Sequence, residues 1–385
     1  MANNEPKEVS SLELELTDDQ EMLRSTTERF ISATCPLTVV RQLAESIAAP
    51  PTGYVAAAAD LGWFAMLVPE DDGGGTISGE GLRDVAIIAE ERGRQLQPGP
   101  FVSMNVVADS LAVLVGDGPR RSLLALLAAG QTVAAWAVAS PAGDWSPGTA
   151  VHAEPTDGGW ELSGRTSLVQ DALGAEWLLV TANAPEGLTQ FLVEAAHDGV
   201  SVEPVHTLDI TQRFANVSFE KVQLPWSAVV GEVGGAESAV ERQLQIAVVL
   251  NACETIGAMT ELFELTRQYA IDRTAFGRPI GSFQAIKHQL ADLSLALECS
   301  KAIAASAVLA VQDRRDDAGE VVSMAKAWIA ERGVDISQGC LQVFAGIGFT
   351  WEHDSHLFVR RITMFGALLG STEWHLERIC ALHGL

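Results

Sequence analysis

The sequence predicts an α+β fold that is mostly α-helical and has three parts: an N-terminal helical domain (residues 1–130), a middle β domain (131–228) and a C-terminal four-helix bundle (229–385). Two observations lead to this prediction. Apolar residues recur at helical spacing in the first third and again after about residue 236. Between them lie short runs rich in Val, Thr and aromatic residues, which are typical of strands.

The first third contains several helix signals. In "LTDDQEMLRSTTERFISATC", Thr17 precedes Asp18 and is followed three residues later by Gln20, which predicts a capping box at a helix start. A second helix is expected to stop at Gly62, before a loop over residues 69–75. Two more are predicted in "GLRDVAIIAEERGRQLQPGP" and "SLLALLAAGQ", the former ended by its Gly and Pro cluster.

The character of the chain changes near Gln131. Six short segments up to about Pro225 are separated by Gly, Pro, Asp or Asn: "TVAAWAVAS", "WELSGRTSLV", "EWLLVTAN", "TQFLVEA", "VSVEPVHTLD" and "FANVSFEKVQL". They predict antiparallel strands that close into a small barrel or sandwich.

Four helices are then expected. The first runs from Ala236 to Asp272, long enough to span a whole subunit as part of a bundle. A Gly-Arg-Pro elbow over 277–279 follows, and Ser282 is expected to cap the second long helix. A polar turn over 314–320 precedes the third helix, and "STEWHLERICALH" forms the fourth.

Composition limits the classes of function. A net charge of −25 argues against non-specific binding of nucleic acid or of anionic membranes, because both need a basic face. The five cysteines are widely spaced without a CxxC pair, so neither a disulfide framework, a zinc site nor another metal site is expected. The beginning of the chain lacks the apolar core of a signal peptide, and no run of about 18 uninterrupted apolar residues occurs. The expectation is a cytoplasmic protein.

Three motifs, in order along the chain, carry a family resemblance. "LGWFAMLVPEDDGG" (61–74), "RTAFGRPIGSFQ" (273–284) and "QVFAGIGFTWEHD" (342–354) are similar to segments of the acyl-CoA dehydrogenases. The helix–strand–helix order resembles theirs as well. Each motif alone is weak evidence, but all three together cover nearly the whole chain.

The resemblance implies FAD as cofactor. Arg273, Phe276 and Gln284 would contact FAD from one subunit, and Gln342 and Gly346 would contact it across a subunit interface. An Arg is a good bidentate partner for a pyrophosphate, and Gly permits close backbone approach. The alternative for Arg273 is a cap at the negative end of its helix.

Ser371 is assigned to the FAD site by the same resemblance. It follows the position where most of the family carry the catalytic Glu, which in "MFGALLGSTEWH" is Leu369. Other members carry the base on the first long helix of the bundle, at a position matched here by Ala247. Neither Leu nor Ala can remove the α-proton of a thioester.

Glu254 lies seven residues after Ala247 and so on nearly the same helical face, which makes it a candidate for a displaced base. The alternative is a polar residue that plugs a pocket or pairs with a neighbour. His353, Asp354 and His356 form a polar cluster, for which a structural or interface role is the commoner interpretation. For His288 a satisfied core or surface histidine is expected.

The β domain departs from the family pattern. "VASPAGDWSP" (138–147) and "LVQDA" (168–172) replace the segments that contact flavin and substrate. "TLDITQRFANVSF" (207–219) instead resembles an actinobacterial subgroup, in which two different subunits form an α2β2 heterotetramer acting on steroid side-chain CoA thioesters. One subunit there supplies the base, and the other keeps the fold and part of the FAD site.

Three interpretations remain open at this point. The first is a base-lacking subunit of a heteromeric acyl-CoA dehydrogenase acting on steroid or other bulky acyl-CoA, with an electron-transfer flavoprotein as electron acceptor. The second is a self-sufficient homotetrameric acyl-CoA dehydrogenase with a displaced base. The third is a non-catalytic scaffold of the same fold.

Overall fold

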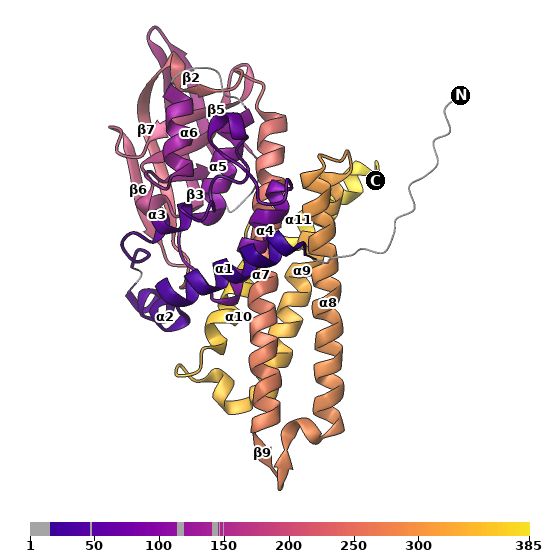
Figure 1. Cartoon of the computed structure of the whole chain (residues 1–385). Coiled ribbons are helices and arrows are strands. Elements are labelled where there is room, and N and C mark those ends of the chain that lie inside the picture. Colours follow the sequence, from indigo (N-terminus) through magenta and orange to yellow (C-terminus); the bar gives the residue numbers. More distant parts are fainter. Residues whose placement is uncertain (1–15, 47, 114–118, 141–144, 146, 149) are drawn as a thin grey trace, which may run out of the picture.

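A computed structural model describes residues 16–385 except 47, 114–118, 141–144, 146 and 149. The N-terminal part is helical, as the sequence predicts (Figure 1). Its first helix has the expected capping box, in which the Thr17 hydroxyl accepts from the Gln20 N–H and the Gln20 side chain accepts from the Thr17 N–H. The helices are α1 (Asp18–Thr34), α2 (Leu37–Ser46), α3 (Tyr54–Ala59), α4 (Gly81–Arg94), α5 (Phe101–Val113) and α6 (Pro119–Ala128).

The middle part is one sheet of eight strands in the order β6-β7-β3-β2-β4-β5-β8, with β1 paired to β4. The expected antiparallel pairing holds for most of it, but β1 and β2 both pair with β4 in parallel, which is a correction. The strands are β1 (Ala134–Ala137), β2 (Val151–Thr156), β3 (Gly159–Gln170), β4 (Trp177–Ala184), β5 (Gly187–Glu194), β6 (Val200–Val205), β7 (Phe214–Pro225) and β8 (Val229–Val230). The last strand extends the sheet two residues beyond the predicted domain boundary.

The C-terminal part consists of three long helices and two shorter ones. They are α7 (Glu237–Asp272), α8 (Gln284–Gln312), α9 (Ala318–Phe344), α10 (Ser355–Phe365) and α11 (Thr372–Leu382). The sequence prediction of four helices missed α10, which begins directly after the third motif. Ser282 does not cap α8: its hydroxyl donates to the Pro279 carbonyl, and Phe283 occupies the cap position.

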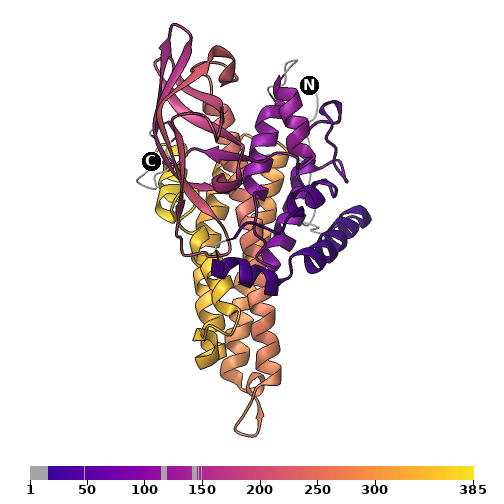
Figure 2. The ribbon, with the colours of Figure 1, turned by 90° about the vertical axis from the view of Figure 1, so that its left-hand side faces the viewer.

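The connection between α7 and α8 is a small hairpin of β9 (Thr274–Ala275) and β10 (Arg278–Pro279). Figure 2 shows it at the end of the bundle remote from the sheet, whereas the sheet and the N-terminal helices flank the opposite half of the bundle. The two halves of the bundle therefore have different surroundings.

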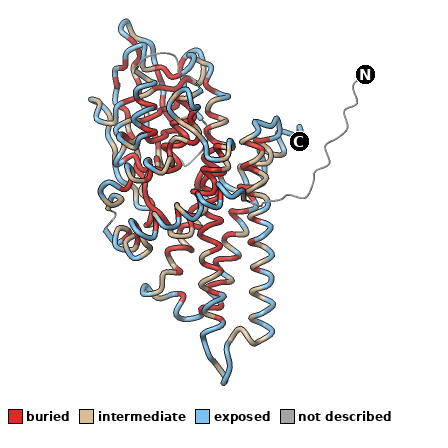
Figure 3. Tube along the Cα trace, viewed as in Figure 1, coloured by how far each residue is buried: buried red, intermediate tan, exposed pale blue. Residues whose placement is uncertain are grey.

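Helix α7 is the centre of the molecule. Its most apolar stretch and that of α8 are long and apolar enough to cross a membrane, but 94% of the stretch in α7 is buried within the fold, as in the core helix of a globular protein. The corresponding stretch of α8 is only 39% buried, and Figure 3 shows its trace largely exposed or intermediate.

Glycines let α4 and α7 cross closely. A Cβ on Gly93 would lie 1.9 Å from the Glu254 carbonyl oxygen, and one on Gly257 would lie 2.0 Å from that of Glu90. Only a residue without a side chain fits such a contact. This crossing brings Arg92 of α4 beside Glu254 of α7.

Candidate functional site

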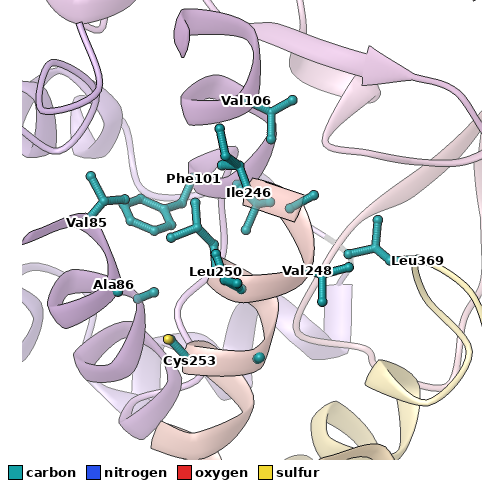
Figure 4. Close-up of a cluster of buried hydrophobic side chains, with 14 of the residues drawn as sticks. Val85, Ala86, Phe101, Val106, Ile246, Val248, Leu250, Cys253 and Leu369 are labelled. Carbon is teal, nitrogen blue, oxygen red and sulfur yellow. The ribbon is translucent and has the colours of Figure 1, made fainter. Parts of the chain in front are cut away.

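The two positions that match the family's catalytic base line one cavity. Ala247 lies on α7, and Leu369 lies in the loop after α10. The cavity has a volume of about 30 Å³ and is bounded by α5, α7, strands β1 and β3, and that loop. Figure 4 shows Leu369 beside Val248 of α7. The residues that line the cavity are Val102, Ser103, Trp136, Val138, Ala139, Trp145, Ser167, Leu168, Gln170, Phe214, Ala247, Asn251, Leu368 and Leu369.

None of these described lining residues is ionisable. A general base must come within hydrogen-bond reach of the proton that it removes, directly or through one water. Among the residues that the structure describes, the cavity therefore contains no group that can take up an α-proton.

Several polar groups of the cavity wall have no hydrogen-bond partner among the described residues. The Ser103 hydroxyl and the indole N–H groups of Trp136 and Trp145 are buried and unpaired. An unmade buried hydrogen bond costs roughly 1–3 kcal/mol. These donors are suited to a ligand that brings hydrogen-bond acceptors.

Glu254 does not line the cavity. It is 2% exposed, and its Oε1 lies 3.0 Å from Nε of Arg92. Its Oε2 accepts from the Gln212 amide at 3.3 Å and lies 3.6 Å from Nη1 of Arg361. Glu254 is thus paired with its neighbours, which is the alternative interpretation to a displaced catalytic base.

The "LDITQR" segment (208–213), which directly precedes β7, extends this ion-pair network from the helices to the sheet. Asp209 pairs with Arg361 of α10, and the Thr211 hydroxyl accepts from the same guanidinium at 2.6 Å. Arg213 pairs with Asp171 at 3.4 Å. Burial raises the pKa of Asp171 to about 6 despite that Arg. The network fastens α4, α7, α10 and the sheet together.

Sequence analysis missed Arg92 and Arg361 in this network. The "LDITQR" motif singled out the segment that holds Asp209 and Gln212, but nothing in the local pattern marked the two arginines. Both are more than nine-tenths buried, which is rare for arginine without a partner. Their role becomes visible only once α4 and α10 are packed against α7.

Two buried basic side chains hold the loop that carries Leu369. The Lys326 amine donates to the Phe365 carbonyl at 2.6 Å, and the His375 Nε2 lies 2.8 Å from the Leu369 carbonyl oxygen. Burial lowers the pKa of Lys326 to about 7 and that of His375 to about 4. Leu369 itself has a φ of +60°, a conformation that non-glycine residues rarely adopt. These contacts therefore hold the loop that carries Leu369 against α9 and α11.

The residues assigned to FAD from the elbow gather at the other end of the bundle. Arg273, Phe276 and Gln284 are all exposed there, Phe276 by 96%. Among the described residues no hydrogen bond or ion pair holds the Arg273 side chain, although its backbone forms the C-cap of α7. Phe276 has a φ of +51°, a strained conformation of the kind that concentrates at functional sites.

Gln342 and Gly346 lie at this same end of the chain. Gln342 accepts from the Gln289 amide of α8 at 3.3 Å, and the rings of Tyr269 and Phe344 are 5.2 Å apart between α7 and α9. Both Gln342 and Gly346 are exposed. The sequence analysis placed these two across an interface from the elbow residues, but the α8–α9 hairpin brings both groups to one end of one chain.

This end is distant from the cavity. Ala247 and Arg273 are 26 positions apart on one continuous helix, or about 39 Å at 1.5 Å per residue. Ser371, whose hydroxyl accepts from the Trp374 N–H at the start of α11, stays near the cavity end beside Leu369. The structure therefore does not bring Ser371 together with the elbow residues within one chain.

The polar cluster of the third motif has a structural environment. Asp354 pairs with Arg41 of α2 at 2.5 Å, and His353 packs on Phe344 with ring centroids 4.6 Å apart. His356 stacks on Trp351 at 4.5 Å. His288 is exposed on α8. In the described part of the chain no group of three His, Cys, Asp or Glu side chains is arranged to hold a metal ion.

Two family models match this chain. The family model "Acyl-CoA dehydrogenase, N-terminal domain" matches residues 17–131, and "Acyl-CoA dehydrogenase, C-terminal domain" matches residues 234–382. The acyl-CoA dehydrogenase IpdE2 of Mycobacterium tuberculosis is 30% identical over 320 residues, covering 83% of this chain and 82% of that protein.

Another relative is longer than this chain. The acyl-CoA dehydrogenase FadE34 of Mycobacterium tuberculosis is 32% identical over 84% of this chain, but the match spans only 41% of FadE34. Among solved structures, the ChsE4-ChsE5 complex of Mycobacterium tuberculosis has a TM-score of 0.86 at 23% identity, covering 96% of this chain and 98% of that one. A variant of the steroid ACAD Tcur3481-Tcur3483 has a TM-score of 0.84 at 27% identity, covering 95% and 98%.

Proposed function

The chain belongs to the acyl-CoA dehydrogenase family, and from this premise we propose that it is the base-lacking subunit of a heteromeric, FAD-dependent acyl-CoA dehydrogenase. One observation carries the proposal. Both base positions, Ala247 and Leu369, face one cavity whose described lining has no ionisable side chain, and the nearby Glu254 is held by two arginines.

Glu254 is unsuited to proton transfer for a physical reason. Protonating it would leave Arg92 and Arg361 buried with one negative charge fewer, and an uncompensated buried charge is costly. Moving its carboxylate into the cavity would break the same contacts. We assign it to the junction between domains, where it stabilises the fold.

The exposed residues at the elbow fit an FAD site. Arg273 offers a free guanidinium for a pyrophosphate, Phe276 offers an uncovered aromatic ring, and Gln284 and Gln342 offer amides. When bound, FAD accepts the hydride that leaves the β-carbon of the acyl group. Because these residues lie about 39 Å along α7 from this chain's own cavity, they would serve a cofactor whose reacting end lies in the partner subunit.

The division of labour follows from this placement. The partner supplies the carboxylate that removes the α-proton, and this chain supplies an anion-binding, aromatic surface that holds the cofactor in place. The half-covered α8 gives the bundle an apolar face for subunit packing, with Leu295, Met324 and Trp328 exposed on α8 and α9.

The relatives favour bulky substrates. A steroid ACAD and the two-protein ChsE4-ChsE5 complex share this fold. We therefore propose steroid or other bulky acyl-CoA thioesters as substrates of the complex, and an electron-transfer flavoprotein as its electron acceptor. A self-sufficient homotetramer is the rival proposal, and it requires a base that the cavity does not contain.

Exchange of the α-proton tests the absence of a base. The purified chain, supplied with FAD, is incubated with octanoyl-CoA in deuterated buffer, and deuterium at the α-carbon is followed by mass spectrometry. We expect incorporation at the rate of buffer alone. Faster incorporation by the chain on its own would overturn the proposal, and its loss in Glu254→Gln would then identify Glu254 as the base.

A further inference from the structure

A second, larger cleft adjoins the cavity. It has a volume of about 520 Å³ and lies between the β4–β5 turn, the first turns of α7, and α11. Trp136, Val138 and Trp145 line both spaces, so the cavity and the cleft are neighbours. The other residues that line the cleft are Pro147, Asn183, Gly187, Leu188, Glu237, Val240, Glu241, Leu244, Trp374 and Arg378.

The cleft has acidic side chains at its mouth. Glu237 and Glu241 line it, and Arg378, the one cation among its described lining residues, is paired with Glu241. Glu186 directly precedes the lining residue Gly187. The turn that holds both residues packs against the turn of residues 232–235, so Glu232 is a further acidic residue near the cleft. The positive end of the α7 dipole is already matched by Glu237 in its first turn.

This charge pattern opposes a polyanion. A CoA thioester carries several phosphate charges, which like charges at the mouth would repel. The Arg378 guanidinium pairs with Glu241, so these two charges offset each other and Glu237 remains as the unpaired charge among the described lining residues. The acidic whole chain, with a net charge of −25, strengthens the effect at long range.

The interior of the cleft is suited to an apolar molecule. Val240, Leu244, Leu188 and Trp374 supply most of its deeper wall. Trp136 is 8% exposed, and its indole N–H has no acceptor. Indole is a donor only, so a ligand that brings an oxygen acceptor would satisfy it. Clefts of this size accommodate drug-sized ligands.

We propose that this cleft binds a neutral, apolar molecule with a carbonyl or hydroxyl oxygen at its buried end, and that its acidic mouth excludes CoA thioesters. The proposal rests on the proposed function, because a subunit without a base has no need to admit the thioester. Glu237 is the residue that determines this specificity.

Tryptophan fluorescence of the full chain tests the proposal, because Trp136, Trp145 and Trp374 line the cleft. Progesterone serves as the neutral probe and decanoyl-CoA as the anionic one. We expect saturable quenching by progesterone and, for decanoyl-CoA, an apparent Kd at least about tenfold higher. Equal or tighter binding of decanoyl-CoA, or no saturable quenching by progesterone, would overturn the proposal.

Two variants and their controls locate the binding. Leu244→Trp should fill the cleft and abolish quenching by progesterone, whereas Leu126→Trp, on the exposed face of α6, should leave it unchanged. Glu237→Lys changes an exposed residue and should strengthen decanoyl-CoA binding about threefold or more, whereas Glu220→Lys on β7, with the same change in net charge, should not. Equal effects of either matched pair would contradict the assignment to this cleft.

The outcome is separable from that of the proposed function. Deuterium exchange catalysed by the chain alone would contradict the proposal that it lacks a base, whether or not progesterone binds. Failure of progesterone to bind, with no exchange, would defeat only the assignment of the cleft.

Discussion

The two ends of helix α7 differ in what they offer a reaction. At the cavity end, Ala247 and Leu369 stand where the family places its base, and the surrounding polar side chains are locked in ion pairs or buried. At the elbow end, Arg273 and Phe276 are exposed and free of side-chain hydrogen bonds among the described residues. The polar side chains at the cavity end are paired or buried within the chain, whereas those at the elbow end are exposed and available to a partner.

This difference shows how one fold can be divided between two subunits. Covering the elbow takes a second chain, because the chain's own cavity is about 39 Å away along the helix. Losing the base at one end leaves the other end intact, since no residue that contacts the base positions also forms the elbow. The ion-pair network near the cavity keeps that helix in place.

The largest effect is expected at the cavity end. Glu254→Gln leaves Arg92 without its buried carboxylate and Arg361 with Asp209 alone, and loss of one partner of a buried pair costs roughly 3–5 kcal/mol. We expect a loss of that order in the free energy of unfolding in urea, with no effect on flavin reduction in complex that remains folded. Exposed Glu298→Gln on α8 is the control and should change stability little. A Glu254→Gln variant that keeps its stability but has lost flavin reduction would contradict the structural assignment of Glu254 and identify it as a catalytic residue.

The buried lysine behind the Leu369 loop gives a pH dependence. The pKa of Lys326 falls from 10.5 in the unfolded chain to about 7 in the fold because of burial. Between those values the unfolded chain binds the extra proton, so stability should rise with pH above 7, by about 2 kcal/mol between pH 7.5 and 9.5. Below pH 7 the penalty for the buried charge is fully present.

Lys326→Met removes this titration. Urea unfolding at pH 7.5 and 9.5 should then show a gain between the two values that is smaller than that of the native chain by about 2 kcal/mol. Lys301→Met, a half-buried lysine on α8 that pairs with Glu298, should keep the native slope. An unchanged slope in Lys326→Met would show that the amine is not desolvated.

A smaller effect is expected at the elbow end. Arg273→Ala removes one charge-assisted contact to a pyrophosphate, worth about 1.5–3 kcal/mol. The FAD content of the complex after dialysis should fall, with a roughly tenfold or greater rise in the dissociation constant. Arg267→Ala, on the same helix and paired with Glu264, should retain FAD. Equal retention by both variants would remove Arg273 from the cofactor site.

Much of this molecule could be predicted from local sequence patterns. Helix α7 begins one residue from its predicted start, and the capping box at Thr17 is present, because both depend on residues close together in the chain. The parallel pairing of β1 and β2 with β4 was missed, because strand partners are chosen by long-range packing that alternation does not encode.

The candidate site could likewise be predicted only in part. The motif match located Leu369 and Ala247, and the structure adds that they share one cavity. The pairing of Glu254 with Arg92 and Arg361 could not be predicted, since it joins residues 162 and 107 positions apart. The position of Gln342 beside the elbow depends on how α8 and α9 fold back on each other, which no local motif reveals.

The central claim is tested most directly by expressing this chain alone and together with each acyl-CoA dehydrogenase-like protein encoded beside it. For each preparation, mass and visible flavin spectrum are recorded before and after addition of a panel of acyl-CoA thioesters. We predict that flavin colour and its bleaching by substrate appear only in a co-purified pair. Flavin colour and bleaching by this chain alone would contradict the account, because they would require a base within its own fold.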